Sequence, residues 1–191
     1  MNFKANYYVP NNIAICLSGD FDPETMIKMI DTYWGKMKPN NNIPKFVSPV
    51  EDPITKPVEQ SVYGPDAEYI NIAYRTTGVH SDDDLMLTMI GRILSNGNAG
   101  LIDLNLVQQQ KVLRASAGVS NMNDYGLFML TASPRQGQTL EELKALLLGE
   151  INKLKNGEFD EWLLEAIINQ RKLSQIRSIE NNSAGYEFVN Q

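Results

Sequence analysis

The sequence predicts an α+β protein, a two-layer sandwich in which helices cover a mostly antiparallel sheet. Two regions, 58–75 and 114–132, alternate apolar and polar residues on both sides of a short turn, and this pattern predicts β-hairpins. The segments between and after them carry apolar residues at helical spacing. Because hairpins pair antiparallel, this order of elements excludes a doubly wound nucleotide-binding fold. The 191 residues, 42% hydrophobic, suffice for one core, so we expect a single domain over 1–191.

The N-terminal part is expected to hold a strand, a helix and a connector. Residues 13–18 are short, apolar and followed by Gly19, which predicts a buried strand. Residues 23–34 place their apolar side chains on one face, which predicts an amphipathic helix that ends at Gly35. The next segment, 38–57, holds five of the nine prolines of the chain. We therefore expect a Pro-rich connector without regular structure there.

The first predicted hairpin joins 58–64 to 69–75 through the turn Pro-Asp-Ala-Glu. The stretch LMLTMIGRIL that follows is apolar on almost every side, which predicts a helix buried between layers. After the turn SNGNAG, the pattern LIDLNLVQQQ predicts a shorter helix. The second hairpin pairs 114–122 with 126–132. Two helices complete the chain.

Several helix starts carry a residue whose side chain can accept hydrogen bonds from the first turn. Thr139 with Glu142 has the spacing of a capping box, and the helix that follows is expected to end at Gly157. Ser81 and Asp84 repeat that spacing. The last helix runs from 161 to about 179. The expected N-caps are Asp22, Ser81, Thr139 and Asp160.

Composition limits the classes of partner and the kinds of cysteine site that the chain can have. The formal net charge of −6 and the pI near 4.8 argue against nucleic acid and anionic membranes as partners. The single cysteine, Cys16, excludes an internal disulfide and a cysteine metal site. The sequence shows no membrane-spanning run and no signal peptide, so we expect a soluble chain of unknown localisation. The tyrosines at 7–8 come just before a predicted strand with nothing to pack on, and GYEFVNQ stops as a new apolar pattern starts, which suggests a piece cut from a longer chain.

The stretch Gly-Asp-Phe-Asp-Pro at 19–23 allows three interpretations: a metal site, a phosphoryl-accepting pair, or a helix start. Asp20 and Asp22 after an apolar run resemble the aspartate pair of haloacid-dehalogenase-type phosphatases. That family has Thr or Val two residues past the second aspartate, where this chain has Glu24. The helix start accounts for every residue, because Asp22 caps, Pro23 fits the first turn and Glu24 complements the helix dipole.

The other candidate groups predict structure more than chemistry. His80, the only histidine, precedes three aspartates, a pattern more typical of a helix start than of a zinc site. A thiol within an apolar run is a poor nucleophile, and SNGNAG lacks the Lys-Ser/Thr of a P-loop. From the residues alone we therefore assign no catalytic residue and no metal ligand, and the substrate-binding residues stay unknown.

Residues 7–35, YYVPNNIAICLSGDFDPETMIKMIDTYWG, carry a recognisable set of phrases. They resemble the entry to the second, non-catalytic domain of the insulinase (pitrilysin) family of zinc peptidases, in which Tyr-Val-Pro-Asn-Asn leads to an apolar strand and Gly-Asp-x-Asp. Later landmarks follow in order over almost the whole chain: the connector, AYRTTGVHSDD, MLTMIGRILSNG, the strand pair around Tyr125-Gly126, and EELKALLLGEINKLKNGEFDEWLLEAI. The resemblance implies the mitochondrial-processing-peptidase-like metallohydrolase fold.

The resemblance also implies a function for a longer, bacterial parent protein. Family members close around a peptide, and zinc is held by His-x-x-Glu-His and a downstream Glu in a preceding domain. This chain has no such motif, so zinc is expected in the catalytic domain of the parent and no cofactor in this chain. The family often has an Arg and, seven residues on, a Tyr near the zinc. Val107 and Arg114 stand at those places here.

Three functions follow as hypotheses. In the first, the chain packs against the catalytic domain of its parent and encloses a peptide substrate. In the second, it is a peptide-binding or assembly subunit from a wholly inactive homologue. The third is a phosphatase that uses Asp20 and Asp22. A homo-oligomer of the isolated chain, formed through the apolar face that its partner would normally cover, is left open as an alternative.

Overall fold

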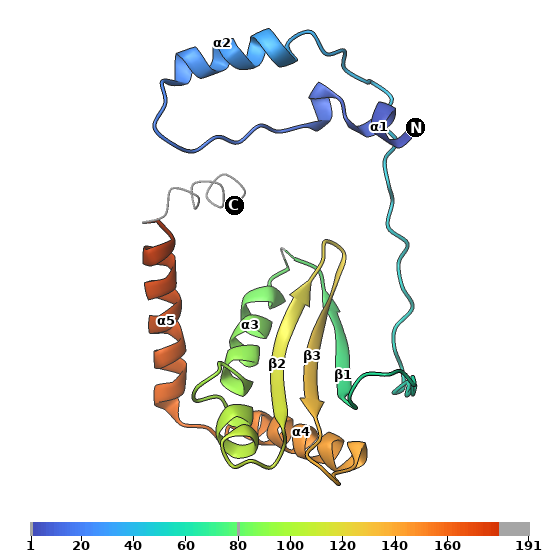
Figure 1. Ribbon diagram of the computed structural model, residues 1–191, viewed down its shortest axis with the longest axis vertical. Helices are drawn as coiled ribbons and strands as arrows, with labels where there is room; N and C mark the ends of the chain where they lie inside the picture. Colours follow the sequence, from blue (N-terminus) through green and yellow to red (C-terminus); the bar gives the residue numbers. More distant parts are fainter. Residues whose placement is uncertain (1, 80, 180–191) are drawn as a thin grey trace. The chain divides into compact units, whose positions relative to one another are not determined.

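The computed structural model describes residues 2–79 and 81–179, in two compact units (Figure 1). One unit comprises residues 53–171, and the other comprises 2–52 with 172–179. The elements are α1 (Asn2–Tyr7), η1 (Pro10–Asn12), α2 (Pro23–Trp34), β1 (Ile70–Thr77), α3 (Asp83–Leu94), the π-helix η2 (Asp103–Val107), β2 (Arg114–Asn121), β3 (Tyr125–Ser133), α4 (Leu140–Lys155) and α5 (Glu161–Ile179).

The 53–171 unit is built on a three-stranded antiparallel sheet in the order β1-β3-β2. Leu130, at the centre of β3, lies opposite Ile72 of β1 and Ala117 of β2. Along β3 the residues alternate strictly between buried and partly exposed, because successive side chains point to opposite faces. The predicted α+β class, with helices on an antiparallel sheet, is confirmed.

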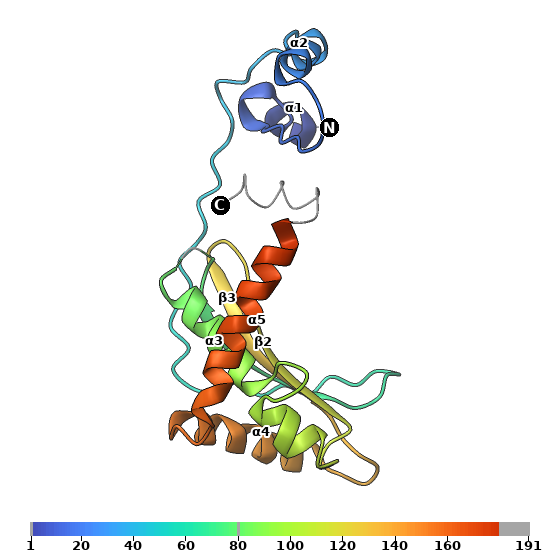
Figure 2. The same ribbon diagram turned by 90° about the vertical axis from the view of Figure 1, so that its left-hand side faces the viewer.

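Helices α3 and α4 and the η2 segment pack on the buried face of the sheet (Figure 2). The core draws Leu94 from α3, Leu106 from η2, Leu130 from β3 and Leu143 and Leu147 from α4, all of them fully or almost fully buried. Each of these elements can form only because the others cover its apolar side, so this unit carries the hydrophobic core.

Two predicted strands are absent. Residues 13–18 form no strand, and Ile15 and Leu17 are 42% and 47% exposed, so the prediction of a buried strand is wrong. The predicted hairpin of 58–64 with 69–75 is also wrong: 58–64 forms no strand, and β1 pairs with β3 instead. An apolar or alternating run shows only that a segment suits a sheet. A strand also needs a neighbour in register, which local pattern does not supply.

The remaining predicted elements are present, but α3 is not buried between layers as predicted. Leu85 and Met86 are 56% and 63% exposed, because only one side of α3 packs on the core. The 38–57 connector has no helix or strand, and the second hairpin forms as β2 and β3. The short helix expected after SNGNAG is a π-helix, in which the amide of Gln108 donates to the carbonyl of Asp103 over 2.8 Å. Gly157, with φ of +72°, follows α4 in the left-handed conformation that glycine adopts without strain.

In the 2–52 part, a pair of asparagines ties the connector to the N-terminal residues. Asn11 donates from Nδ2 to the carbonyl of Asn40 over 2.9 Å and accepts the amide of Asn40 at Oδ1 over 3.0 Å. Asn40 in turn donates to the carbonyl of Asn6. None of the residues of α1 or α2 is buried, so the apolar face of α2 is not covered by the described residues of its own unit.

An ion pair between Glu59 and Lys144 links the segment that follows the connector to α4. The hydrogen bond from Lys144 lowers the pKa of Glu59, and the same bond raises the pKa of Lys144. The pair therefore stabilises fully above the usual pKa of Glu and below that of Lys. Its contribution is lost as the pH falls through the lowered pKa of Glu59 or rises through the raised pKa of Lys144.

We expect the Glu59 carboxyl to titrate, by carbon-detected NMR, below the ordinary Glu value of about 4.3, and Lys144→Met to return it to that value. Lys153→Met is the matched control, since Lys153 pairs with Glu150. Equal Glu59 titration in the wild type and in Lys144→Met would show that the ion pair does not form in solution.

Candidate functional site

The two aspartates of the opening motif lie in different surroundings. Oδ1 of Asp22 accepts from the backbone N of Thr25 over 2.8 Å and from its hydroxyl over 2.7 Å. These two bonds, the hydroxyl first, hold the pKa of Asp22 below its usual value. Asp20 is exposed. One carboxylate of the pair thus serves as the N-cap of α2.

Asp22→Ala is expected to fray the first turn of α2, because the amide of Thr25 loses its acceptor. Hydrogen exchange at the Thr25 amide should quicken by about fivefold at neutral pH. The effect should shrink as the pH falls through the lowered pKa of Asp22, since a protonated cap accepts more weakly. Asp20→Ala, two residues earlier, is the control and should leave this exchange unchanged. Equal exchange rates at the Thr25 amide in the two variants would show that Asp22 does not cap α2.

The other three predicted caps differ among themselves. Thr139 accepts the amide of Glu142 over 3.2 Å, and the Glu142 carboxylate accepts the amide of Thr139 over 2.9 Å, a complete capping box. Asp160 directly precedes α5, and its carbonyl accepts the amide of Leu163.

Ser81 is not a cap, which corrects the prediction: α3 begins two residues later, with Asp82 at the N-cap and no side-chain cap bond. The Ser81 hydroxyl instead lies 2.8 Å from the hydroxyl of Thr77. It therefore forms its hydrogen bond with the last residue of β1 and not with the first turn of α3. His80, the other candidate of this stretch, lies outside the described residues. The described part of the chain holds no group of three His, Cys, Asp or Glu side chains that could bind a metal ion.

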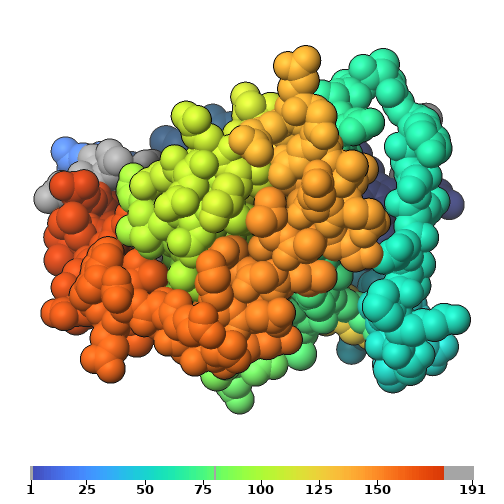
Figure 3. Space-filling view, turned by 90° about the horizontal axis from the view of Figure 1, so that it is seen from below, coloured from blue at the N-terminus to red at the C-terminus, as the bar shows by residue number. Residues whose placement is uncertain are grey.

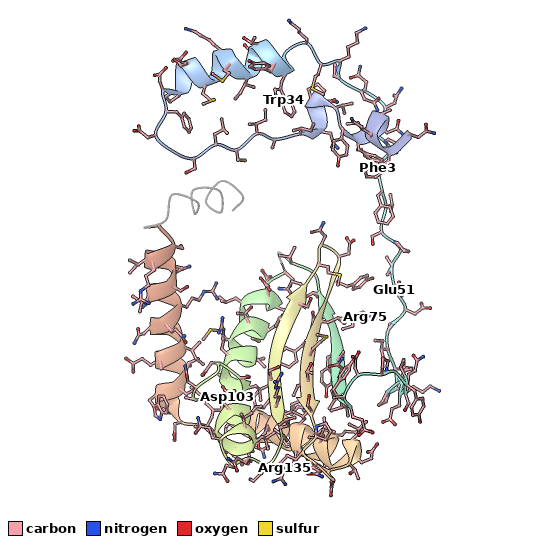
Figure 4. All side chains as sticks on the ribbon, in the orientation of Figure 1. Phe3, Trp34, Glu51, Arg75, Asp103 and Arg135 are labelled. Atoms are coloured by element: carbon pink, nitrogen blue, oxygen red, sulfur yellow. The ribbon has the colours of Figure 1, made fainter. Side chains whose placement is uncertain are left out.

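The loop SNGNAG is organised by Asp103, a residue that the sequence analysis did not single out. Its carboxylate is almost fully buried. It accepts four hydrogen bonds, from the hydroxyl of Ser95 and from the amides of Asn96, Gly97 and Gly100, at 2.8–3.2 Å. Figure 4 shows Asp103 beside the end of α3. A lone Asp within the apolar run LIDLNL was the available signal. The Asp103 carboxylate itself takes up these donors, so the hydrogen bonds of the loop serve the fold.

Val107 and Arg114 are not brought together as a substrate clamp. Val107 ends η2 and packs against the hydrophobic core. Arg114 begins β2, is exposed and lies opposite Ser133. An Arg and a Tyr do meet elsewhere: the guanidinium of Arg75 lies 5.3 Å from the ring centroid of Tyr125.

Arg75 and Tyr125 belong to the sheet face opposite the core, because Arg75 pairs with Leu127 and the odd-numbered residues of β3 face away from the core. Figure 4 labels Arg75 on β1. The alternation of β3 puts Leu127 and Met129 on this same face, both only partly exposed. This face therefore combines a cation, an aromatic ring and apolar side chains, a mixture that suits contact with extended polypeptide. Sequence reasoning missed it because the two residues are 50 positions apart and meet only through the β1–β3 register.

The chain matches the family model described as the peptidase M16 inactive domain over residues 1–171. It is 22% identical over 189 residues to the zinc protease PqqE of Helicobacter pylori, covering 95% of this chain and 42% of that protein. The crystal structure of a protease from Helicobacter pylori shares its fold, with a TM-score of 0.80 at 18% identity, over 98% of this chain and 46% of that one.

The chain thus spans less than half the length of both relatives. The helices described in the structure include none long and apolar enough to cross a membrane. The family match covers the N-terminal phrases, the sheet and the start of α5. The chain therefore belongs to the peptidase M16 inactive domain family, the non-catalytic, C-terminal type of insulinase-family domain.

Proposed function

We propose that this chain is a non-catalytic, substrate-enclosing domain of a bacterial zinc metalloendopeptidase whose zinc site lies in another domain of a longer parent. The observation that carries this proposal is the match to the inactive peptidase domain over 1–171. A relative named a zinc protease that is more than twice as long supports it. Residues 1–191 act in this proposal as a single domain, with 38–57 as its internal connector.

The proposed work of the domain is to form one wall around the substrate. The sheet face of Arg75, Tyr125, Leu127 and Met129 is free of helices among the described residues of its unit and offers a wall for an unfolded peptide (Figure 2). The apolar face of α2, which the described residues of its own unit do not cover, is the surface proposed to pack on the catalytic domain. Without that partner, the same face would favour self-association.

The test uses the full-length parent protein. We expect one zinc ion per parent chain, bound outside the segment that corresponds to residues 1–191, and cleavage of a quenched unfolded peptide. A parent that binds the peptide without zinc and without cleavage would favour the second function, a peptide-binding or assembly subunit of an inactive homologue. A parent that neither binds nor cleaves the peptide would contradict the proposal.

A further inference from the structure

A groove of about 530 Å³ opens between the η2 segment and the turn from α4 to α5, within the 53–171 unit (Figure 3). Figure 3 shows this side of the surface, where the yellow-green η2 segment adjoins the orange helices. The volume is sufficient for one large side chain and its flanking backbone. Its lining combines apolar and polar side chains, among them Leu101, Asn105, Lys153, Glu158, Asp160, Trp162 and Leu163.

The apolar part of the groove includes buried Leu101 and Leu163 and the indole ring of Trp162. Trp162 is 53% exposed, yet its Nε1 donates to Oδ2 of Asp160 over 3.1 Å. The indole N–H is therefore already satisfied, and the bond restrains the ring at the rim. What the ring still offers a ligand is its π-face, which attracts cations.

The polar part of the groove is rich in hydrogen-bond acceptors. Nδ2 of Asn105 donates to Glu150 over 2.7 Å, which leaves Oδ1 of Asn105 as an acceptor. One oxygen of Glu158 accepts from Asn156 over 2.9 Å, and one oxygen of Asp160 accepts from Trp162. Each carboxylate keeps its second oxygen for a further donor. Three acceptors thus surround an apolar floor.

The only cation that lines the groove among the described residues, Lys153, is already compensated. Its Nζ lies 2.8 Å from Oε1 of Glu150, a side chain that is only 3% exposed. The α5 N-terminus adds a partial positive charge, which Glu161 in the first turn of the helix offsets. With Lys153 neutralised by Glu150, the remaining charge of the groove is that of Glu158 and Asp160, so the groove is electronegative.

We infer that this groove binds the side chain of one arginine presented by another polypeptide. The methylene stem would lie on Leu101 and Leu163, and the guanidinium would stack on Trp162 and donate to the acceptors of Asn105, Glu158 and Asp160. A planar group with five donors satisfies three separate acceptors better than an ammonium does, so arginine is preferred to lysine. This inference stands on the groove alone and does not depend on the proposed function.

The test uses the full chain with Trp34→Phe, so that Trp162 is the only tryptophan. The probes are acetyl-Ala-Arg-Ala-amide and the same peptide with lysine or with citrulline, which keeps the shape of arginine without its charge. The arginine peptide should change the fluorescence of Trp162 saturably, with a Kd on the order of 1 mM, as expected of so small a ligand. Its affinity should exceed that of the citrulline peptide by about tenfold.

Two variants locate the binding. Glu158→Gln should lower the affinity for the arginine peptide by about fivefold, since it removes one carboxylate of the groove. Glu165→Gln, the same charge change on α5 away from the groove, should leave the affinity unchanged. Equal binding of arginine and citrulline peptides, equal loss in the two variants, or no saturable signal would each overturn the inference. If the chain binds the arginine peptide as expected while its parent lacks peptidase activity, the arginine site stands and only the proposed function fails.

Discussion

Asp103→Ala is expected to destabilise the 53–171 unit by about 3 kcal/mol. The substitution removes a buried carboxylate and leaves the hydroxyl of Ser95 and the amides of Asn96, Gly97 and Gly100 without their acceptor. Leaving a buried donor without its charged acceptor lowers the free energy of unfolding by more than an ordinary hydrogen bond contributes, because the donor stays desolvated. The loop from α3 to η2 would then lose the group that shapes it.

Urea unfolding followed by circular dichroism measures this loss. Asp103→Asn is the informative companion: its amide keeps one acceptor oxygen but turns an NH₂ group toward donor groups, so it should lose almost as much stability. Asp66→Ala, at an exposed position in the same unit, should change the free energy of unfolding by less than about 0.5 kcal/mol. If Asp103→Ala behaved like Asp66→Ala, the loop would not depend on this carboxylate.

Leu130→Ala is expected to cost about 3 kcal/mol, the second large effect. Leu130 is fully buried at the centre of β3, where it faces the core formed by α3 and α4. Removing its side chain leaves a cavity between two layers that the rigid sheet cannot close. Leu85→Ala on α3, where the leucine is 56% exposed, is the matched control and should cost far less. The same urea experiment measures both, and similar losses would contradict the packing described for the sheet.

The elements that the sequence predicts correctly are those whose partners are near in the chain. The β2–β3 hairpin closes through three residues, and α4 is determined by its capping box, its apolar stripe and Gly157. The predictions of a strand at 13–18 and of a hairpin over 58–75 were wrong, because apolar and alternating patterns do not determine which strand a segment pairs with. β1 finds its neighbour in β3, with Ile70 paired to Ala132, 62 positions away.

The site residues divide in the same way. The cap at Asp22 can be read from four consecutive residues, because the acceptor and its donor are neighbours. Asn105 and Glu150 are 45 positions apart, and Arg75 and Tyr125 meet across two strands. Such pairs depend on the packing of η2 on α4 and on the register of the sheet. Sequence pattern contains neither, so the groove and the sheet face emerge only in the structure.

The most direct measurement of the central claim is the zinc content of the purified 191-residue chain by elemental analysis, with a quenched-peptide cleavage assay in added zinc. We expect no stoichiometric zinc and no cleavage, since the catalytic zinc is assigned to another domain of the parent. One tightly bound zinc per chain, or turnover that rises with added zinc, would contradict it and place a catalytic site within these residues.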